Sequence, residues 1–224
     1  MSVQTAKHLI NVSHLEFMAE MPPGSRLQLP NVSWTDYEYL LGEINDSSCV
    51  RISYDKGGLE LMTLSPKHEI IKVLFTHILS VLTEELGMAL ISLGSTTFKL
   101  PTEARGTEPD DCFYIRRAEL IEEKETIDLS LDPGPDLVLE VDLSHPSLDK
   151  FPIYASLEVT EIWRYDGESI HFYLLTNGAY DEIPSSDLFP FLTPKTLGEF
   201  LLPGKLRDIN KLKKAFRQWV NANK

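Results

Sequence analysis

The clearest pattern of apolar residues along the chain predicts one long helix. Apolar residues recur at intervals of three and four from Ile70 to Leu82. Ser65 followed by Pro66 is typical of a helix start, because serine caps the first turn and proline fits the first helical position. Gly87 is typical of a helix end. We therefore expect a helix here that lies across a sheet.

Shorter apolar segments on both sides of this helix predict strands and further helices. Segment 136–142 is the most hydrophobic strand in the chain, so we expect it at the centre of the sheet. The other predicted strands are 50–54, 59–63, 89–95, 97–100, 110–115, 161–166 and 169–175, and the other predicted helices are 36–42, 115–122, 149–157 and 209–220. Helices and strands in this order indicate a mixed sheet flanked by helices.

The chain length suits one sizeable α/β domain with extensions at both ends. It has 224 residues, 42% of them hydrophobic and 25% charged, which is ordinary for a globular protein. We predict an irregular N-terminal arm over 1–34, a domain over 35–203 with extra N-terminal strands, and a basic C-terminal helix over 204–224. The Pro-Pro-Gly-Ser sequence at 22–25 is the reason for expecting an irregular arm.

Charge is unevenly distributed along the chain. The net charge of −13 argues against a broad nucleic-acid footprint, because phosphate binding needs clustered lysine and arginine. Residues 103–142 carry thirteen acidic against four basic side chains, and residues 205–224 carry seven basic against one acidic. The basic segment is typical of a solvent-exposed helix face, and the alternative is that it binds nucleic acid. The acidic segment could supply carboxylate ligands for a divalent cation.

The sequence has no pattern typical of export or membrane insertion. Residues 1–10 lack the apolar segment and cleavage site of a secretory signal, and no run of about 18 apolar residues occurs. Cys49 and Cys112 form neither a disulfide framework nor a metal-binding spacing. We therefore expect a cytoplasmic protein in a reducing compartment, with no membrane partner.

Three side chains form the candidate chemical site. Glu140 lies inside the apolar sequence Leu-Val-Leu-Glu-Val, where an unpaired carboxylate would be costly to bury. Asp110 is expected at the start of a neighbouring strand, so the two carboxylates could hold Mg²⁺, which takes oxygen ligands and keeps several waters. Lys150 begins the following helix, where its charge opposes the helix dipole. Its ammonium could orient an attacking water or stabilise charge on a phosphate.

An ordered set of motifs carries a resemblance to a known family. The segments are Glu108-Pro109-Asp110, Pro135-Asp-Leu-Val-Leu-Glu-Val141, Asp149-Lys150, Tyr154 and Glu161-Ile-Trp163. Together they resemble the restriction-endonuclease-like family widespread in cyanobacteria, the Uma-two family of the PD-(D/E)xK nuclease superfamily. The likeness spans about residues 36–173. It implies a restriction-endonuclease-like fold and an endonuclease, dependent on Mg²⁺ or Mn²⁺, that hydrolyses DNA phosphodiester bonds as a homodimer.

The resemblance also implies roles for individual residues. Asp110 matches the first acid of the motif and Glu140 the second, and Glu69 looks like the auxiliary acid, so all three are expected to bind the metal directly or through water. The motif lysine two positions after Glu140 is missing, and Asp142 stands there. The resemblance implies that Lys150 takes over as the catalytic lysine. Asp142 could add a metal ligand or disturb the activation of water.

Other interpretations of the same residues stay open. Glu140 and Lys150 could form a structural ion pair in a catalytically silent binding module that keeps the nuclease scaffold. A metal-dependent phosphoesterase acting on small nucleotides would suit the negative net charge better than duplex DNA does. His68 and His145 border the candidate site, but they lack zinc-binding spacing and are typical first-turn or loop residues.

Overall fold

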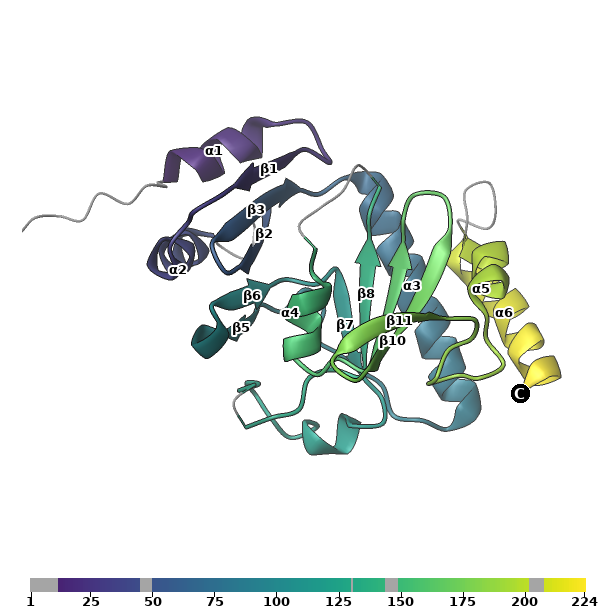
Figure 1. Cartoon of the computed structure of the whole chain (residues 1–224). Coiled ribbons are helices and arrows are strands. Elements are labelled where there is room, and N and C mark those ends of the chain that lie inside the picture. The colour runs from purple at the N-terminus through teal and green to yellow at the C-terminus, as the bar shows by residue number, and fades with distance from the viewer. Residues whose placement is uncertain (1–11, 45–49, 130, 144–148, 202–207) are drawn as a thin grey trace, which may run out of the picture.

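The computed structural model describes residues 12–44, 50–129, 131–143, 149–201 and 208–224. These residues form a central sheet, a smaller N-terminal sheet and the helices that cover them (Figure 1). The elements are α1 (Val12–Glu20), β1 (Arg26–Leu29), α2 (Trp34–Glu43), β2 (Val50–Asp55), β3 (Gly58–Thr63), α3 (Pro66–Leu86), β4 (Ile91–Ser92), β5 (Phe98–Leu100), η1 (Pro101–Glu103), β6 (Arg105–Thr107), β7 (Asp111–Tyr114), η2 (Ala118–Leu120), β8 (Leu137–Val141), α4 (Phe151–Ser156), β9 (Glu161–Tyr165), β10 (Ile170–Thr176), β11 (Ala179–Ile183), α5 (Pro194–Leu201) and α6 (Ile209–Asn223). The fold is therefore mixed α/β, as the sequence predicted.

The central sheet contains the strand that carries Glu140. Its strand order is β11-β10-β9-β8-β7-β4, in which β8 and β9 run parallel and the other neighbours antiparallel. All residues of β8 are buried, which explains its apolar sequence, since a central strand is covered on both faces. Because β7 runs antiparallel to β8, the start of β7 lies beside the end of β8. The candidate site lies at this end of the sheet, where β8 ends and β7 begins.

Helix α3 covers one face of the central sheet together with α5 and α6. It begins where the Ser65 hydroxyl accepts a hydrogen bond from the His68 backbone N–H, and it ends at Gly87, which adopts a left-handed conformation with a φ of 65°. Its apolar side packs in the largest core cluster, which includes Phe75 of α3 and Leu139 of β8. The helix therefore carries its first turn over the edge where β7 begins (Figure 1).

Helix α4 covers the opposite face of the central sheet. Its buried residues Ile153 and Tyr154 pack in one apolar cluster with Val138 of β8 and Cys112 of β7. Side chains alternate along a strand, so residues 138 and 140 of β8 point toward the same face. Glu140 is therefore directed toward α4, away from the core beneath α3.

The N-terminal sheet has the strand order β1-β3-β2-β6-β5, with every neighbouring pair antiparallel. Tyr37 of α2 stacks on Tyr54 of β2 with ring centroids 5.0 Å apart, and both belong to a core of their own. Gly106 is required in β6, because a Cβ there would lie 2.3 Å from the Tyr37 hydroxyl. This sheet lies beside the central sheet at the edge where the candidate site lies (Figure 1).

Several predicted elements need correction. The prediction of an irregular arm over 1–34 is wrong for the described part of that range. Residues 12–20 form α1, and residues 26–29 form β1, which pairs with β3. The predicted helix over 115–122 is only the 3₁₀ turn 118–120, and the sequence did not predict β11 or α5. Short elements such as these owe their existence to tertiary contacts rather than to a local pattern. Within the described ranges, no helix combines the length and the apolar character needed to cross a bilayer.

Candidate active site

Asp110 and Glu140 face each other across the edge of the central sheet. Asp111 pairs with Leu139 in the antiparallel β7–β8 register, so Asp110 and Glu140 occupy the next position along both strands. Cys112 and Val138, which share their faces by alternation, pack together beneath α4. Both carboxylates are buried, with 3% of Asp110 and 5% of Glu140 exposed. The structure therefore brings together two acids that are thirty positions apart in the sequence.

Among the described residues, Glu140 has two polar side-chain partners, and both come from the start of α4. The ammonium nitrogen of Lys150 lies 3.1 Å from Oε1 and 2.9 Å from Oε2 of Glu140. The Tyr154 hydroxyl donates to Oε1 of the same carboxylate. Lys150 occupies the N-cap position of α4, and Tyr154 lies one turn further along, so a single helical turn aims both groups at Glu140. An ammonium and a hydroxyl thus balance the buried carboxylate.

The surroundings shift the pKa values of this pair strongly. Burial raises the pKa of Glu140 to about 7, and the negative charges of Asp110 and Asp142 raise it further. The Lys150 charge and the Tyr154 hydrogen bond act in the opposite direction and lower it. Burial disfavours the charged form of Lys150, but the charges of Glu140 and Asp110 outweigh it and raise the pKa of Lys150. Lys150 is therefore positively charged at neutral pH beside a carboxyl that titrates close to neutrality.

Asp110 is held by groups from two other elements. Its Oδ2 accepts a hydrogen bond of 2.6 Å from the backbone N–H of Val141, and its Oδ1 lies 2.9 Å from Nε2 of His68 in the first turn of α3. Burial alone would raise the pKa of Asp110, but the His68 ring and the Lys150 charge outweigh it and hold that pKa below its usual value. Asp110 is therefore an ionised carboxylate, as a metal ligand must be.

The donor set fits Mg²⁺ bound by two carboxylates and water. The described residues contain no group of three His, Cys, Asp or Glu side chains arranged as ready metal ligands. Mg²⁺ does not need such a cage, because one or two carboxylates suffice and waters complete its coordination. Glu69 is 43% exposed and its Oε1 lies 3.3 Å from Nδ1 of His68. A role for Glu69 at the metal through water therefore stays a prediction.

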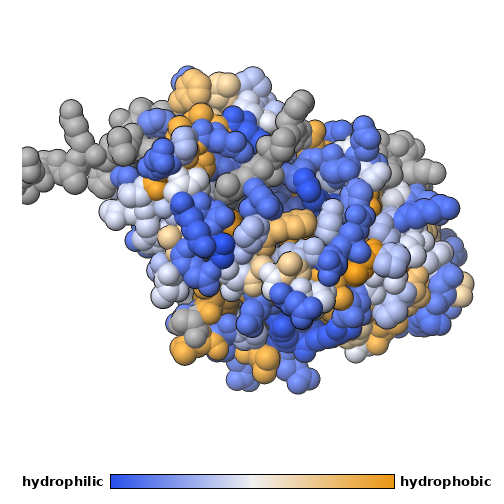
Figure 2. Space-filling view, in the orientation of Figure 1, coloured by the Kyte–Doolittle hydropathy of each residue, from blue (hydrophilic) through white to orange (hydrophobic). Residues whose placement is uncertain are grey.

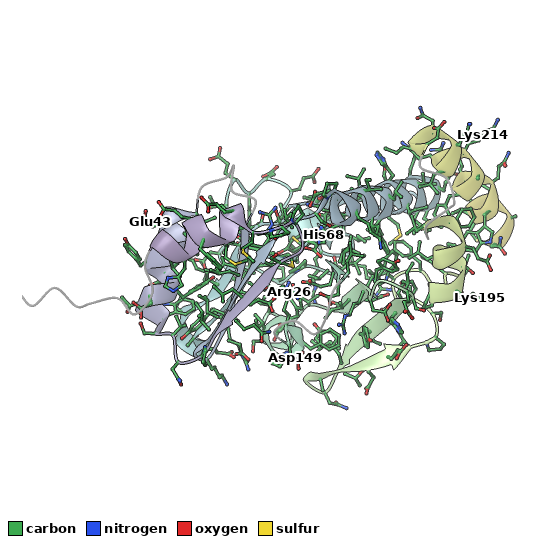
Figure 3. The ribbon with its side chains drawn as sticks, turned by 90° about the horizontal axis from the view of Figure 1, so that it is seen from above. Arg26, Glu43, His68, Asp149, Lys195 and Lys214 are labelled. Atoms are coloured by element: carbon green, nitrogen blue, oxygen red, sulfur yellow. The ribbon has the colours of Figure 1, made fainter. Side chains whose placement is uncertain are left out.

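Asp142, which replaces the motif lysine, is engaged by two arginines. Its Oδ1 accepts from Nη2 of Arg26 at 2.9 Å, and its Oδ2 accepts from Nε of Arg164 at 2.9 Å. Arg26 also lies 3.4 Å from Oε1 of the buried Glu60. Figure 3 shows Arg26 and His68 near the middle of the molecule, where the two sheets meet. Asp142 thus links β1 of the N-terminal sheet to the central sheet.

Asp136, just before β8, serves the fold rather than this chemistry. Oδ2 of Asp136 accepts the backbone N–H groups of Ile115 and Arg117, at 2.7 and 2.9 Å, so Asp136 organises the turn after β7. His145 lies outside the described residues.

The basic C-terminal helix lies far from the two carboxylates. Arg217 of α6 pairs with Glu84 and Glu85 near the end of α3, with nitrogen–oxygen distances of 2.6 Å to each. His68 and Glu84 are sixteen residues apart on α3, about 24 Å at the helical rise of about 1.5 Å per residue. Figure 3 accordingly shows Lys214 at one end of the molecule and His68 near its middle. Any contact of α6 with a substrate is therefore remote from the site.

Comparisons with known proteins bear on the family and the fold of the chain. The model of the Uma2 family, described as "Putative restriction endonuclease", matches residues 34–203. The chain belongs to the Uma2 family. Among solved structures it resembles a crystal structure titled as a "putative nuclease belonging to DUF820 from Anabaena variabilis", with a TM-score of 0.51 and 15% identity, over 76% of this chain and 99% of that one. That likeness shows a shared fold. A search of the curated proteins found no match.

Membership of the Uma2 family makes the chain nuclease-like, and the structure adds residues that sequence reasoning missed. Tyr154 was noted only as part of a motif, and its hydroxyl contacts Glu140. Arg26 and Arg164 were not considered, although both hold Asp142. The pairing of Arg26 with Asp142 joins residues 116 positions apart, and no local pattern signals such a contact.

Proposed function

We propose that this protein is a divalent-metal-dependent endonuclease that hydrolyses phosphodiester bonds in DNA. The observation that carries the proposal is the position of Lys150, whose ammonium contacts the buried Glu140 directly opposite Asp110. Two carboxylates and a lysine at one edge of a sheet are the groups that such a reaction needs. Membership of the Uma2 family supports the same activity.

Each residue of the site has a role in this proposal. Asp110 and Glu140 hold Mg²⁺ or Mn²⁺, with Glu69 acting through water. When bound there, such an ion would supply an acidified water and a positive charge for the phosphate. Lys150 orients the attacking water and stabilises the charge that develops on the phosphate oxygens. Tyr154 keeps the Glu140 carboxylate in place through its hydroxyl.

DNA binding would use basic side chains outside the site. Arg217 of α6 pairs with Glu84, about 24 Å along α3 from His68 at about 1.5 Å per residue, which corresponds to about seven base pairs at about 3.4 Å each. A homodimer would bring a second set of such residues to the same duplex. The face of the protein seen in Figure 2 is mostly hydrophilic, with apolar residues in scattered groups. We propose the cytoplasm as the location, where the buried thiol of Cys112 stays reduced.

A second candidate is a phosphoesterase acting on small nucleotides. A cavity of about 450 Å³ lies between α2, β2 and the segment before β5, and polar groups dominate its lining. Arg51, Thr97 and Glu108 line it, and Glu108 precedes Asp110 by only two residues. Such a cavity suits a ligand of nucleotide size better than it suits a duplex.

Calorimetry with Mg²⁺ and Mn²⁺, combined with a plasmid nicking assay, tests the proposal. We expect the wild-type chain to bind the ion and nick plasmid, and Glu140→Ala to lose both. Glu182 is an exposed carboxylate on β11, so Glu182→Gln serves as the control. We expect this variant to keep both ion binding and plasmid nicking. Cleavage of dinucleotides without nicking would favour the phosphoesterase. A wild-type chain that neither binds the ions nor nicks would overturn the proposal in favour of a silent binding module.

A further inference from the structure

A row of polar side chains crosses the central sheet through the candidate site. Glu140 of β8 pairs with Arg164 of β9 in the parallel register, and Asp110 occupies the matching position just before β7. Side chains paired in register on neighbouring strands point toward the same face of the sheet. Ile162, two positions before Arg164, packs in one cluster with Val138, so it marks this face on β9. Arg164 therefore lies one strand away from Glu140, at a strand spacing of about 4.8 Å.

Arg164 is open to solvent, unlike the carboxylate beside it. Its side chain is 33% exposed, compared with 6% for that of Glu140. Arg26, which shares the carboxylate of Asp142, is 13% exposed and also reaches the buried Glu60. Arg26 is thus enclosed by two carboxylates and belongs to the contact between the sheets. Of the two arginines on Asp142, Arg164 is the one that a substrate can reach.

The guanidinium of Arg164 keeps hydrogen-bond donors for a further ligand. Its Nε donates to Oδ2 of Asp142 at 2.9 Å, and the side chain also forms a hydrogen bond with the Tyr173 hydroxyl on β10. These contacts use two of the five N–H groups that a guanidinium carries. In the described part of the chain, Asp142 is the only ion-pair partner of Arg164. The rest of the planar group is available to an anion.

A phosphate group matches these donors in shape and charge. Arginine presents parallel N–H groups in a rigid plane, and two of them fit two oxygens of one phosphate. The hydrogen bond to Asp142 holds that plane, so less conformational freedom is lost when an anion binds. A phosphate next to Glu140 would also lie next to the reacting group of the proposed reaction.

We infer that Arg164 binds a phosphate of the nucleic-acid strand that is cleaved at Asp110 and Glu140. This inference rests on the proposed function and names the side chain that receives the strand beside the site. Asp142 is a positioning residue in this arrangement, because it holds the guanidinium without touching the substrate. The strand thus passes from β8 toward β9 at this end of the sheet.

The salt dependence of DNA binding tests this inference. Each phosphate that a cation neutralises contributes about 0.9 to the slope of log affinity against log salt concentration. In chelator-treated buffer, we expect Arg164→Gln to weaken the binding of a short fluorescent duplex about fivefold and to reduce that slope by about 0.9. Arg164→Lys should restore the slope with its charge, while its affinity stays below that of the wild type because an ammonium lacks the fork. Fluorescence anisotropy at several KCl concentrations gives both quantities.

Two controls separate a phosphate contact from a structural role. Asp142→Asn breaks the same ion pair but leaves the guanidinium, so it should keep the slope of the wild type. Arg116→Gln removes an exposed arginine that pairs with Asp187 beyond the end of β7, and it should keep both affinity and slope. If Asp142→Asn loses as much slope as Arg164→Gln, the effect is structural and the inference is wrong.

The outcomes separate this inference from the proposed function, because binding is measured without metal and without cleavage. A slope that Arg164→Gln leaves unchanged, in a protein that nicks plasmid, overturns the inference alone. A protein that shows the slope dependent on Arg164 but never nicks supports the phosphate contact and contradicts the nuclease. A wild type that does not bind the duplex overturns the inference. If Arg164→Gln does not fold, the affinity of Arg164→Lys provides the test, and an affinity equal to that of the wild type contradicts the contact.

Discussion

Lys150 contacts both carboxylate oxygens of Glu140, at 3.1 and 2.9 Å, although neither residue is well exposed to water. Such a buried pair is costly to break from one side, because the remaining charge stays in the interior without a partner. The pair therefore couples the stability of the protein to the groups that would perform the reaction.

Lys150→Met should destabilise the metal-free protein more than Lys150→Met combined with Glu140→Gln. We expect a loss of about 3 kcal/mol in the free energy of unfolding for the single variant, since it leaves Glu140 buried alone. The double variant should recover most of that loss. Urea unfolding in chelator-treated buffer measures both values. Equal losses in the two variants would show that the pair contributes nothing to stability.

Asp142→Asn should weaken the fold without weakening the metal site. The substitution removes charge-assisted hydrogen bonds to Arg26 and Arg164, for which we expect a loss of about 1–2 kcal/mol. The affinity for Mn²⁺ should change less than threefold. Thermal unfolding and calorimetry on the same sample measure the two effects. A large loss of Mn²⁺ affinity with unchanged stability would instead identify Asp142 as a ligand.

Metal binding should strengthen as the pH rises through neutrality. Burial, followed by the charges of Asp110 and Asp142, raises the pKa of Glu140 to about 7, so below that pH a proton must leave before the carboxylate can bind an ion. Calorimetry in buffers of different ionisation enthalpy should show about one proton released per ion at pH 6 and nearly none at pH 8. The same release at both pH values would contradict the raised pKa.

The stability of the metal-free protein should follow the opposite trend. A carboxyl whose pKa is raised on folding, here from 4.5 to about 7, favours the folded state when protonated. Its contribution is complete below about pH 4.5 and is lost as the pH rises through 7. Comparing wild type with Glu140→Gln across this range isolates the contribution, because glutamine does not titrate. Parallel stability curves for the two proteins would refute it.

Local sequence signals were sufficient for the elements that carry the site. The Ser65-Pro66 start and the Gly87 end define α3, which spans 66–86. The apolar strand predicted over 136–142 is β8, which spans 137–141 at a central position in the sheet. These elements are recognisable because a capped helix and a fully buried strand both impose a strong local pattern.

Contacts between distant elements could not be predicted in this way. β1 has four residues and owes its place to pairing with β3, so its sequence alone carries too little pattern. The partners of Asp142 come from β1 and β9, and the orientation of His68 toward Asp110 depends on how α3 crosses the sheet. Such relationships depend on the packing of the whole chain rather than on spacing.

The position of a bound ion shows whether Asp110 and Glu140 form the metal site. Crystals soaked in Mn²⁺ can be measured at a wavelength where manganese gives an anomalous signal. We expect one strong anomalous peak between the carboxylates of Asp110 and Glu140, and we expect Asp110→Asn to remove it. A peak elsewhere on the protein, or none at a saturating concentration of Mn²⁺, would contradict this expectation.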